Sequence, residues 1–187
     1  MPVYAGVGKR MVPQAVLREC RRLGEYLAKL GWTLRSGGAD GCDLAFEVGC
    51  DLVNGDKEIY LVERLHSKLS NWAEEMKINP RPEGRTFEIS PLAYDIAMEH
   101  HPVPDRLGYY AKQLMARNSH IVLGADLQSP VDMLVCYLYP SARHGGTKQS
   151  VRLANHYGIP VFNLLDQESV AEVERYGRLC GTVENQG

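Results

Sequence analysis

Short apolar runs alternate with helical patterns through the first third of the chain, and this alternation limits the fold more than any other feature. Apolar runs at 3–8, 32–35 and 58–62 predict three strands. Between the first two strands, Leu23 and Leu27 recur on one helical face, and a second helix is predicted from about 43 to 53. Strands joined by helices through short loops predict a parallel sheet with helices on both faces.

The pattern changes after residue 62. Residues 63–90 are polar, with prolines near their end, which predicts an excursion off the sheet. Ser90 and Pro91 have the form of a helix start, and prolines shortly after residue 101 end that helix. We therefore expect one α/β domain over residues 1–187, with a helical or irregular insertion at about 63–104.

The remaining residues return to the alternating pattern. A helix is predicted at about 106–123, and the apolar run at 131–139 is the clearest strand signal in the chain. A glycine turn at 144–147 then opens a further helix. The run at 159–165 predicts the last strand, and a helical segment follows at 166–180.

Composition narrows the classes of protein that the chain can belong to. The net charge of −2 provides no overall basic surface for duplex DNA, although a local basic patch stays open. No apolar stretch approaches the ~20 residues of a membrane helix, so no membrane partner and a cytoplasmic location are expected. The five cysteines form no CxxC pair, and adjacent helical residues such as His100 and His101 point about 100° apart. Neither a metal site nor a cofactor is expected.

Three glycine-rich turns follow predicted strands and precede predicted helices: GVGKR at 6–10, SGGADG at 36–41 and HGGT at 144–147. Such turns present backbone N–H groups and the positive end of a helix dipole, which bind anions, unless the glycines serve turn geometry alone. In open α/β sheets they meet at the carboxyl ends of the strands, where ligands bind. The expected phosphate- and nucleotide-binding residues here are Gly6, Gly8, Lys9, Arg10, Ser36, Gly37, Gly38, Gly145, Gly146 and Thr147.

Two carboxylates, Asp43 and Glu47, follow the second glycine turn. They stand at i and i+4 on one face of the predicted helix, where like charges repel. Asp43 either complements the helix dipole or contacts a sugar in the pocket. Burial of Glu47 in a pocket would raise its pKa and suit it to act as acid, base or nucleophile. A solvated or ribose-binding Glu47 is the alternative.

The motifs also resemble a known family. LRSGGADGCDLAFEVG is similar to the SMF/DprA motif SGxAxGxDxxAH, with Glu47 at the position of the family histidine. ARNSHIVLGA resembles the family's RNRLIAGLS helix, and this match adds Arg117 and Asn118 to the nucleotide-binding residues. The last strand, glycine turn and helix also match. The resemblance covers most of residues 3–164 and is strongest to the DprA-like proteins of bacteriophages. It implies the Rossmann-like, three-layer fold of the SLOG superfamily.

The resemblance and the residues together leave three functions open. The first is a protein that binds a nucleotide or nucleotide derivative, with Glu47 and Asp43 as candidate catalytic groups for hydrolysis or transfer of an N-glycosidic bond. The second is a non-catalytic sensor or sponge for an NAD-derived or cyclic nucleotide signal. The third, less favoured, is a DprA-like protein that binds single-stranded DNA. The resemblance further implies a homo-oligomer, in the host cytoplasm if a phage encodes the chain.

Overall fold

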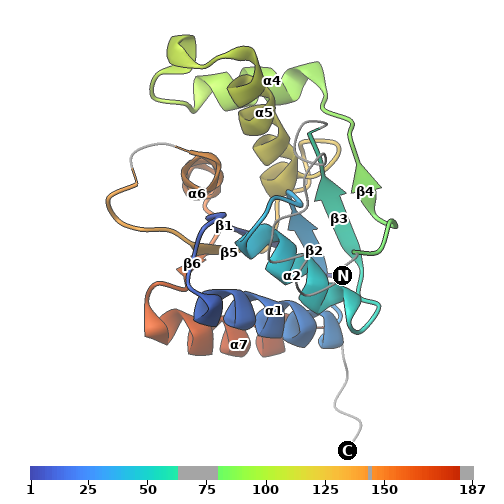
Figure 1. The fold of residues 1–187 in the computed structure, drawn as a ribbon. Helices are drawn as coiled ribbons and strands as arrows, with labels where there is room; N and C mark the ends of the chain where they lie inside the picture. The colour runs from blue at the N-terminus through green and yellow to red at the C-terminus, as the bar shows by residue number, and fades with distance from the viewer. Residues whose placement is uncertain (63–79, 143–144, 182–187) are drawn as a thin grey trace, which may run out of the picture.

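The computed structural model describes residues 1–62, 80–142 and 145–181. Six parallel strands form one sheet in the order β4-β3-β2-β1-β5-β6 (Figure 1). The strands are β1 (Val3–Gly8), β2 (Thr33–Ser36), β3 (Lys57–Tyr60), β4 (Arg85–Thr86), β5 (Met133–Tyr137) and β6 (Val161–Asn163). The parallel α/β fold class that the sequence predicts is confirmed.

Helices cover both faces of the sheet. One face carries α1 (Gln14–Lys29), α2 (Cys42–Asp51) and α7 (Gln167–Cys180). The other face carries α4 (Pro91–Glu99), α5 (Tyr109–Leu123) and α6 (Gly146–His156), and a single 3₁₀ turn, η2 (Pro104–Arg106), joins α4 to α5. In Figure 1, α1 and α7 lie below the strands while α5 and α6 lie above them.

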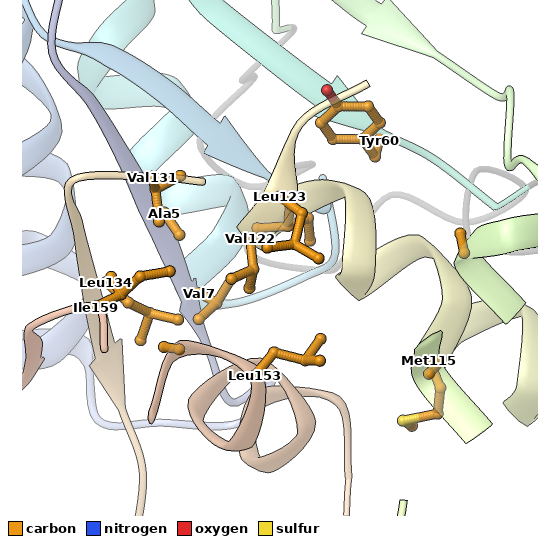
Figure 2. Packing of buried hydrophobic residues seen from close by; sticks show 14 of the residues in the cluster. Ala5, Val7, Tyr60, Met115, Val122, Leu123, Val131, Leu134, Leu153 and Ile159 are labelled. Atoms are coloured by element: carbon orange, nitrogen blue, oxygen red, sulfur yellow. The ribbon is translucent and has the colours of Figure 1, made fainter. Parts of the chain in front are cut away.

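Side chains alternate between the two faces because successive residues of a strand point in opposite directions. In β1, Tyr4 packs with α1 and α2, whereas Ala5 and Val7 pack with α5 and α6. Figure 2 shows Val7 and Leu134 of the sheet on the side that faces α5 and α6. β5 is buried throughout, which fits a central strand of a parallel sheet and explains why its sequence signal is the clearest.

The largest difference from the sequence prediction lies after residue 80. Arg85 and Thr86 form the edge strand β4, within a segment that was expected to lie off the sheet. The N–H groups of Ile59 and Leu61 donate to the carbonyls of Gly84 and Thr86, at 2.6 and 2.7 Å. A two-residue polar strand held by backbone hydrogen bonds leaves no side-chain periodicity to detect. Residues 63–79 of the predicted insertion lie outside the described residues.

The expected helix ends follow glycine and proline as predicted. Gly31 takes a φ of 79° directly after α1, and Gly124 takes a φ of 84° after α5. Pro91 occupies the first turn of α4, and α5 starts at Tyr109 rather than near residue 106. The three residues before Leu107 form the 3₁₀ turn instead.

The five cysteines are free: four are buried and Cys180 is exposed. Among the described residues, no group of three or more metal-binding side chains is arranged to hold an ion. No helix in the described parts of the chain is long and apolar enough to span a bilayer.

Candidate functional site

A cleft opens between β1 and β5, where the strand order, which runs outward from β1 to β4 on one side, continues on the other side. β1 and β5 are neighbours, but the helices that follow them, α1 and α6, lie on opposite faces of the sheet. At such a switch point the two crossovers diverge and leave a crevice beyond the carboxyl ends of the strands. The cleft here measures about 390 Å³ and is called the switch-point cleft below. Its described lining is Val7, Gly8, Lys9, Arg10, Met11, Ala39, Asp43, Leu114, Arg117, Asn118, Leu138, Ala142, Gly145, Gly146, Thr147, Lys148 and Ser150.

Positive charge dominates the described lining of this cleft. Lys9, Arg10, Arg117 and Lys148 face a single carboxylate, Asp43. Lys9 also lies over the ring of Tyr139, with its Nζ 4.4 Å from the ring centroid, a cation–π contact that orients it. A concave surface with an excess of one charge concentrates its field, so the cleft attracts anions.

Arg117 projects from α5 into the base of the cleft. Its Nη1 donates to the carbonyls of Gly37 and Tyr60, the latter at 3.1 Å, and its Nε donates to Asn118 Oδ1 at 2.9 Å. The guanidinium thus joins the ends of β2 and β3 to α5. No carboxylate in the described chain lies within ion-pair distance of it. Burial lowers the pKa of Arg117, the charge of Asp43 opposes this shift, and that of Arg10 adds to it.

Gly37 is required by the close approach of Arg117. A methyl group built on Gly37 would lie 2.1 Å from Arg117 Nη1 and 2.8 Å from Asp43 Oδ2. Any larger residue would therefore push the guanidinium out of its position, so this glycine shapes the cleft without lining it.

Asp43 lies in the first turn of α2 and faces the end of β1. Its Oδ1 accepts a hydrogen bond from the N–H of Gly8 at 2.9 Å. Burial raises the pKa of Asp43 to about 6, against the opposing effects of Arg117 and of the N–H groups of Gly8, Gly37 and Ala39. A modest fall in pH below neutrality therefore protonates Asp43 and removes the negative charge of the described cleft lining.

The start of α6 forms the opposite wall of the cleft. Gly145 takes a φ of 113°, a conformation that favours glycine, and the helix begins at Gly146 without a side-chain cap. The free N–H groups of this first turn carry the positive end of the helix dipole. Asn118 Nδ2 donates to the carbonyl of Gly146 at 3.0 Å and so fixes this turn against α5.

The structure brings together most of the residues that the sequence predicted for nucleotide binding. Those that line the switch-point cleft are Gly8, Lys9, Arg10, Asp43, Arg117, Asn118, Gly145, Gly146 and Thr147. Those that do not line it are Gly6, Ser36, Gly37, Gly38 and Glu47. Their roles in binding stay predictions.

Gly6, Ser36 and Gly38 support the strand ends behind the cleft. A methyl group on Gly6 would lie 2.8 Å from the Phe46 ring, so β1 and α2 pack too closely for a side chain there. Ser36 Oγ donates to the Gly6 carbonyl at 2.6 Å and ties β2 to β1. Gly38 takes a φ of 56°, which turns the chain from β2 toward α2.

Glu47 lies one turn beyond Asp43 but in a different environment. It is fully buried, and Arg85 binds its two oxygens through Nε and Nη2, each at 2.8 Å. Lys57 Nζ donates to Oε1 at 2.8 Å. Among the described residues, every hydrogen bond that Glu47 accepts comes from a cation. Its candidate catalytic role stays a prediction, and the structure places it outside the lining of the cleft.

Glu47 belongs to a buried ion cluster that the sequence did not indicate. Lys57 also binds Asp51 at 2.8 Å, and Asp51 in turn binds Arg81 at 2.8 Å. With Arg85, the five residues join α2, β3 and β4, and are called the α2–β4 cluster below. Two partners stand 30 and 38 residues from their carboxylates, a separation that no local pattern reveals.

Lys148 is the cleft cation that the sequence analysis missed. It follows Thr147 in the first turn of α6 and lines the same wall. Its position directly after the HGGT turn was the available signal, because residues of a helix's first turn share the anion site of its N-terminus.

Comparison with known proteins shows a likeness in fold to a solved structure. No family model and no curated protein match the chain. Among solved structures, the fold is similar to that of DNA processing protein A from Helicobacter pylori. The TM-score is 0.55 and the identity 19%, over 95% of this chain and 73% of that one. This likeness shows the fold, and that structure was described for its mode of binding single-stranded DNA. The narrower resemblance to bacteriophage proteins stays a prediction.

Proposed function

We propose that this chain binds single-stranded DNA by its sugar–phosphate backbone in the switch-point cleft. The observation that carries the proposal is the composition of the cleft: four cations and a free helix N-terminus face one carboxylate. Arginine and lysine side chains and helix N-termini are the groups that bind backbone phosphates. The similarity in fold to a protein described for binding single-stranded DNA supports this choice of ligand.

The overall charge of −2 argued against DNA at the level of the sequence, but the local arrangement outweighs it. Charges beyond about 10 Å are screened at ordinary salt, so a bound phosphate responds to the cleft and not to the whole chain. The acidic residues Glu47 and Asp51 are paired with cations in the α2–β4 cluster, so they do not oppose an anion at the cleft.

The site favours binding over catalysis. Cleavage of an N-glycosidic bond needs a carboxylate that reaches the anomeric carbon. Glu47 accepts its hydrogen bonds from Lys57 and Arg85 and lies outside the lining of the cleft. Asp43 accepts the N–H of Gly8. Glu47 is therefore not placed for attack, and Asp43, although it lines the cleft, is held by a backbone N–H, an arrangement that favours binding over catalysis.

A free mononucleotide is the second candidate ligand. The cleft volume of about 390 Å³ falls within the ~300–1,000 Å³ of small-molecule sites, which favours a compact ligand of this kind. The two candidates differ in length dependence, since DNA that extends beyond the cleft gains further contacts while a mononucleotide fills the site alone.

Fluorescence anisotropy with labelled oligothymidylates at 50 to 300 mM salt tests the proposal. We expect binding that weakens steeply with salt and strengthens from mononucleotide to oligonucleotide. Arg10→Ala with Lys148→Ala should lower the slope of log K against log salt by about 2, because each lost phosphate contact removes about 1. Lys29→Ala with Arg175→Ala removes the same charge from α1 and α7 and should leave the slope unchanged. No binding at 50 mM salt, or equal slopes for both double variants, would overturn the proposal.

A further inference from the structure

A second cleft lies beside the first and differs from it in chemistry. It measures about 540 Å³ and is formed by the end of β3, the segment after β4, and the helices α4 and α5. Its described lining is Leu61, Val62, Phe87, Ile89, Tyr94, Tyr109, Tyr110 and Gln113. Half of these residues are aromatic and none carries a charge, so we name it the aromatic cleft.

Of the three tyrosines of this cleft, Tyr94 packs against the hydrophobic core, whereas Tyr109 and Tyr110 are not part of it. Within the described residues, no other aromatic ring packs against Tyr94, Tyr109 or Tyr110. Tyr109 is 78% exposed, and its hydroxyl accepts a hydrogen bond from Gln113 Nε2 at 3.1 Å. Exposing a large apolar ring gains nothing in folding, whereas a ring on the wall of a cleft offers its π-face to a ligand.

The two clefts lie next to each other along α5. Tyr110 and Gln113 line the aromatic cleft, while Leu114 and Arg117, each four residues further on, line the switch-point cleft. Residues four apart are neighbours on one helical face. Arg117 also donates to the carbonyl of Tyr60, the residue directly before the Leu61 of the aromatic cleft. Arg117 lies seven residues after Tyr110 on the helix, a rise of about 10 Å, so one flexible ligand can reach both clefts.

The pairing of the two clefts specifies the chemistry of such a ligand. One end must be anionic to suit the cations around Arg117, and the other must be flat, uncharged and aromatic to suit the tyrosines. A nucleotide strand has both parts, and bases stack on aromatic side chains whatever the sequence. We propose that the aromatic cleft is a base-stacking subsite for the single-stranded DNA whose phosphates occupy the switch-point cleft. This inference rests on the proposed function.

A tyrosine variant and an abasic ligand together test the subsite. Tyr109→Ala removes an exposed ring, so the fold tolerates it, and Tyr94→Leu keeps bulk while removing the π-system. We expect each to weaken oligonucleotide binding about tenfold. The salt slope and mononucleotide binding should not change. Tyr157→Ala, which removes a partly exposed ring on the far end of α6, is the matched control.

Oligothymidylates with single abasic sites at successive positions complete the cycle. At one position, removal of the base should weaken binding to the wild type as much as Tyr109→Ala weakens binding of the intact oligonucleotide. Removal of the same base should weaken binding to the Tyr109→Ala variant only slightly further. 2-Aminopurine at that position should be quenched by the wild type and less by the variant. If Tyr109→Ala and Tyr94→Leu behave as Tyr157→Ala does while salt-dependent binding persists, the subsite is wrong and the proposed function stands. If the wild type binds no oligonucleotide, both fall.

Discussion

Asp43 and Glu47 stand one turn apart on the same helix, yet their surroundings are opposite. Asp43 accepts a backbone N–H at the edge of an open, positively charged cleft. Glu47 is enclosed and accepts three hydrogen bonds from two cations. The first region holds an excess of unmatched positive charge, and the second matches its charges internally. Charge that is left unmatched at a cleft is available to a ligand, whereas charge that is matched in the interior serves to hold elements together.

The largest expected effect is on stability, and it separates charge that holds elements together from charge that binds a ligand. Glu47→Gln removes the carboxylate charge that Arg85 binds and one of the two carboxylates that Lys57 binds, so the free energy of unfolding should fall by about 3 kcal/mol. Urea unfolding measures it. Oligonucleotide affinity of the folded variant should be unchanged. The control is Glu25→Gln, which breaks the solvent-exposed pair with Lys29 and should have little effect. Unchanged stability with loss of nucleotide turnover would show that Glu47 is catalytic after all.

The next effect tests whether the cleft depends on the position of Arg117. Gly37→Ala places a methyl group where the guanidinium lies, and the resulting overpacking should cost about 2 kcal/mol of stability. Displacement of Arg117 should also weaken oligonucleotide binding. Thermal unfolding and anisotropy measure the two effects. Gly108→Ala, where an added methyl meets nothing within 4 Å, should change neither. A Gly37→Ala protein that is stable and binds normally would show that Arg117 has room to move.

A third variant gives the cleft cation Arg117 a carboxylate partner within the protein. Asn118→Asp sets a carboxylate beside Arg117 Nε and cancels the charge that the cleft presents. Oligonucleotide binding at 50 mM salt should weaken about tenfold, within the range of a close charge interaction near a protein surface. Asn155→Asp makes the same change of charge at an exposed position of α6 and should have little effect. Equal losses in the two variants would mean that overall charge, and not the cleft, governs binding.

The smallest expected effect is a pH dependence that only the open region should show. Asp43 has a pKa raised to about 6, so it is charged at pH 7.5 and becomes neutral as the pH falls through 6. Loss of this negative charge favours an anionic ligand. The affinity for the oligonucleotide should therefore rise about fivefold toward pH 5, a change of about 1 kcal/mol in binding free energy. Oligonucleotides without terminal phosphates avoid the titration of phosphate itself. Asp43→Asn should flatten the profile, and a profile that stays unchanged would assign the effect to another group.

The sequence predicted five of the six strands, their parallel arrangement and the meeting of the glycine turns, because these depend on local periodicity and on glycine. Gly8 and Gly145 reach the cleft as expected since each ends or follows a strand. The division between Asp43 and Glu47 was not predictable, because it depends on Arg85, which reaches Glu47 from an edge strand 38 residues away. The adjacent Tyr109 and Tyr110 are visible in the sequence as candidates for stacking on a base. The cleft that they line was not predictable, because the rest of its lining comes from the end of β3, the segment after β4 and α4.

The four buried cysteines can serve as probes of local opening of the structure. The buried thiols are shielded from solvent, so reagents reach them only when the structure opens. Burial also raises the pKa of Cys136 to about 12, which lowers the share of the reactive thiolate at that residue. Exposed Cys180 reacts at once and marks the start of the trace. Cys42 is buried at the start of α2 and lies against Gly8, which lines the switch-point cleft. The rate at which Cys42 is modified therefore reports how often this wall of the cleft opens. A ligand bound in the cleft should lower that rate in proportion to the fraction of protein that it occupies.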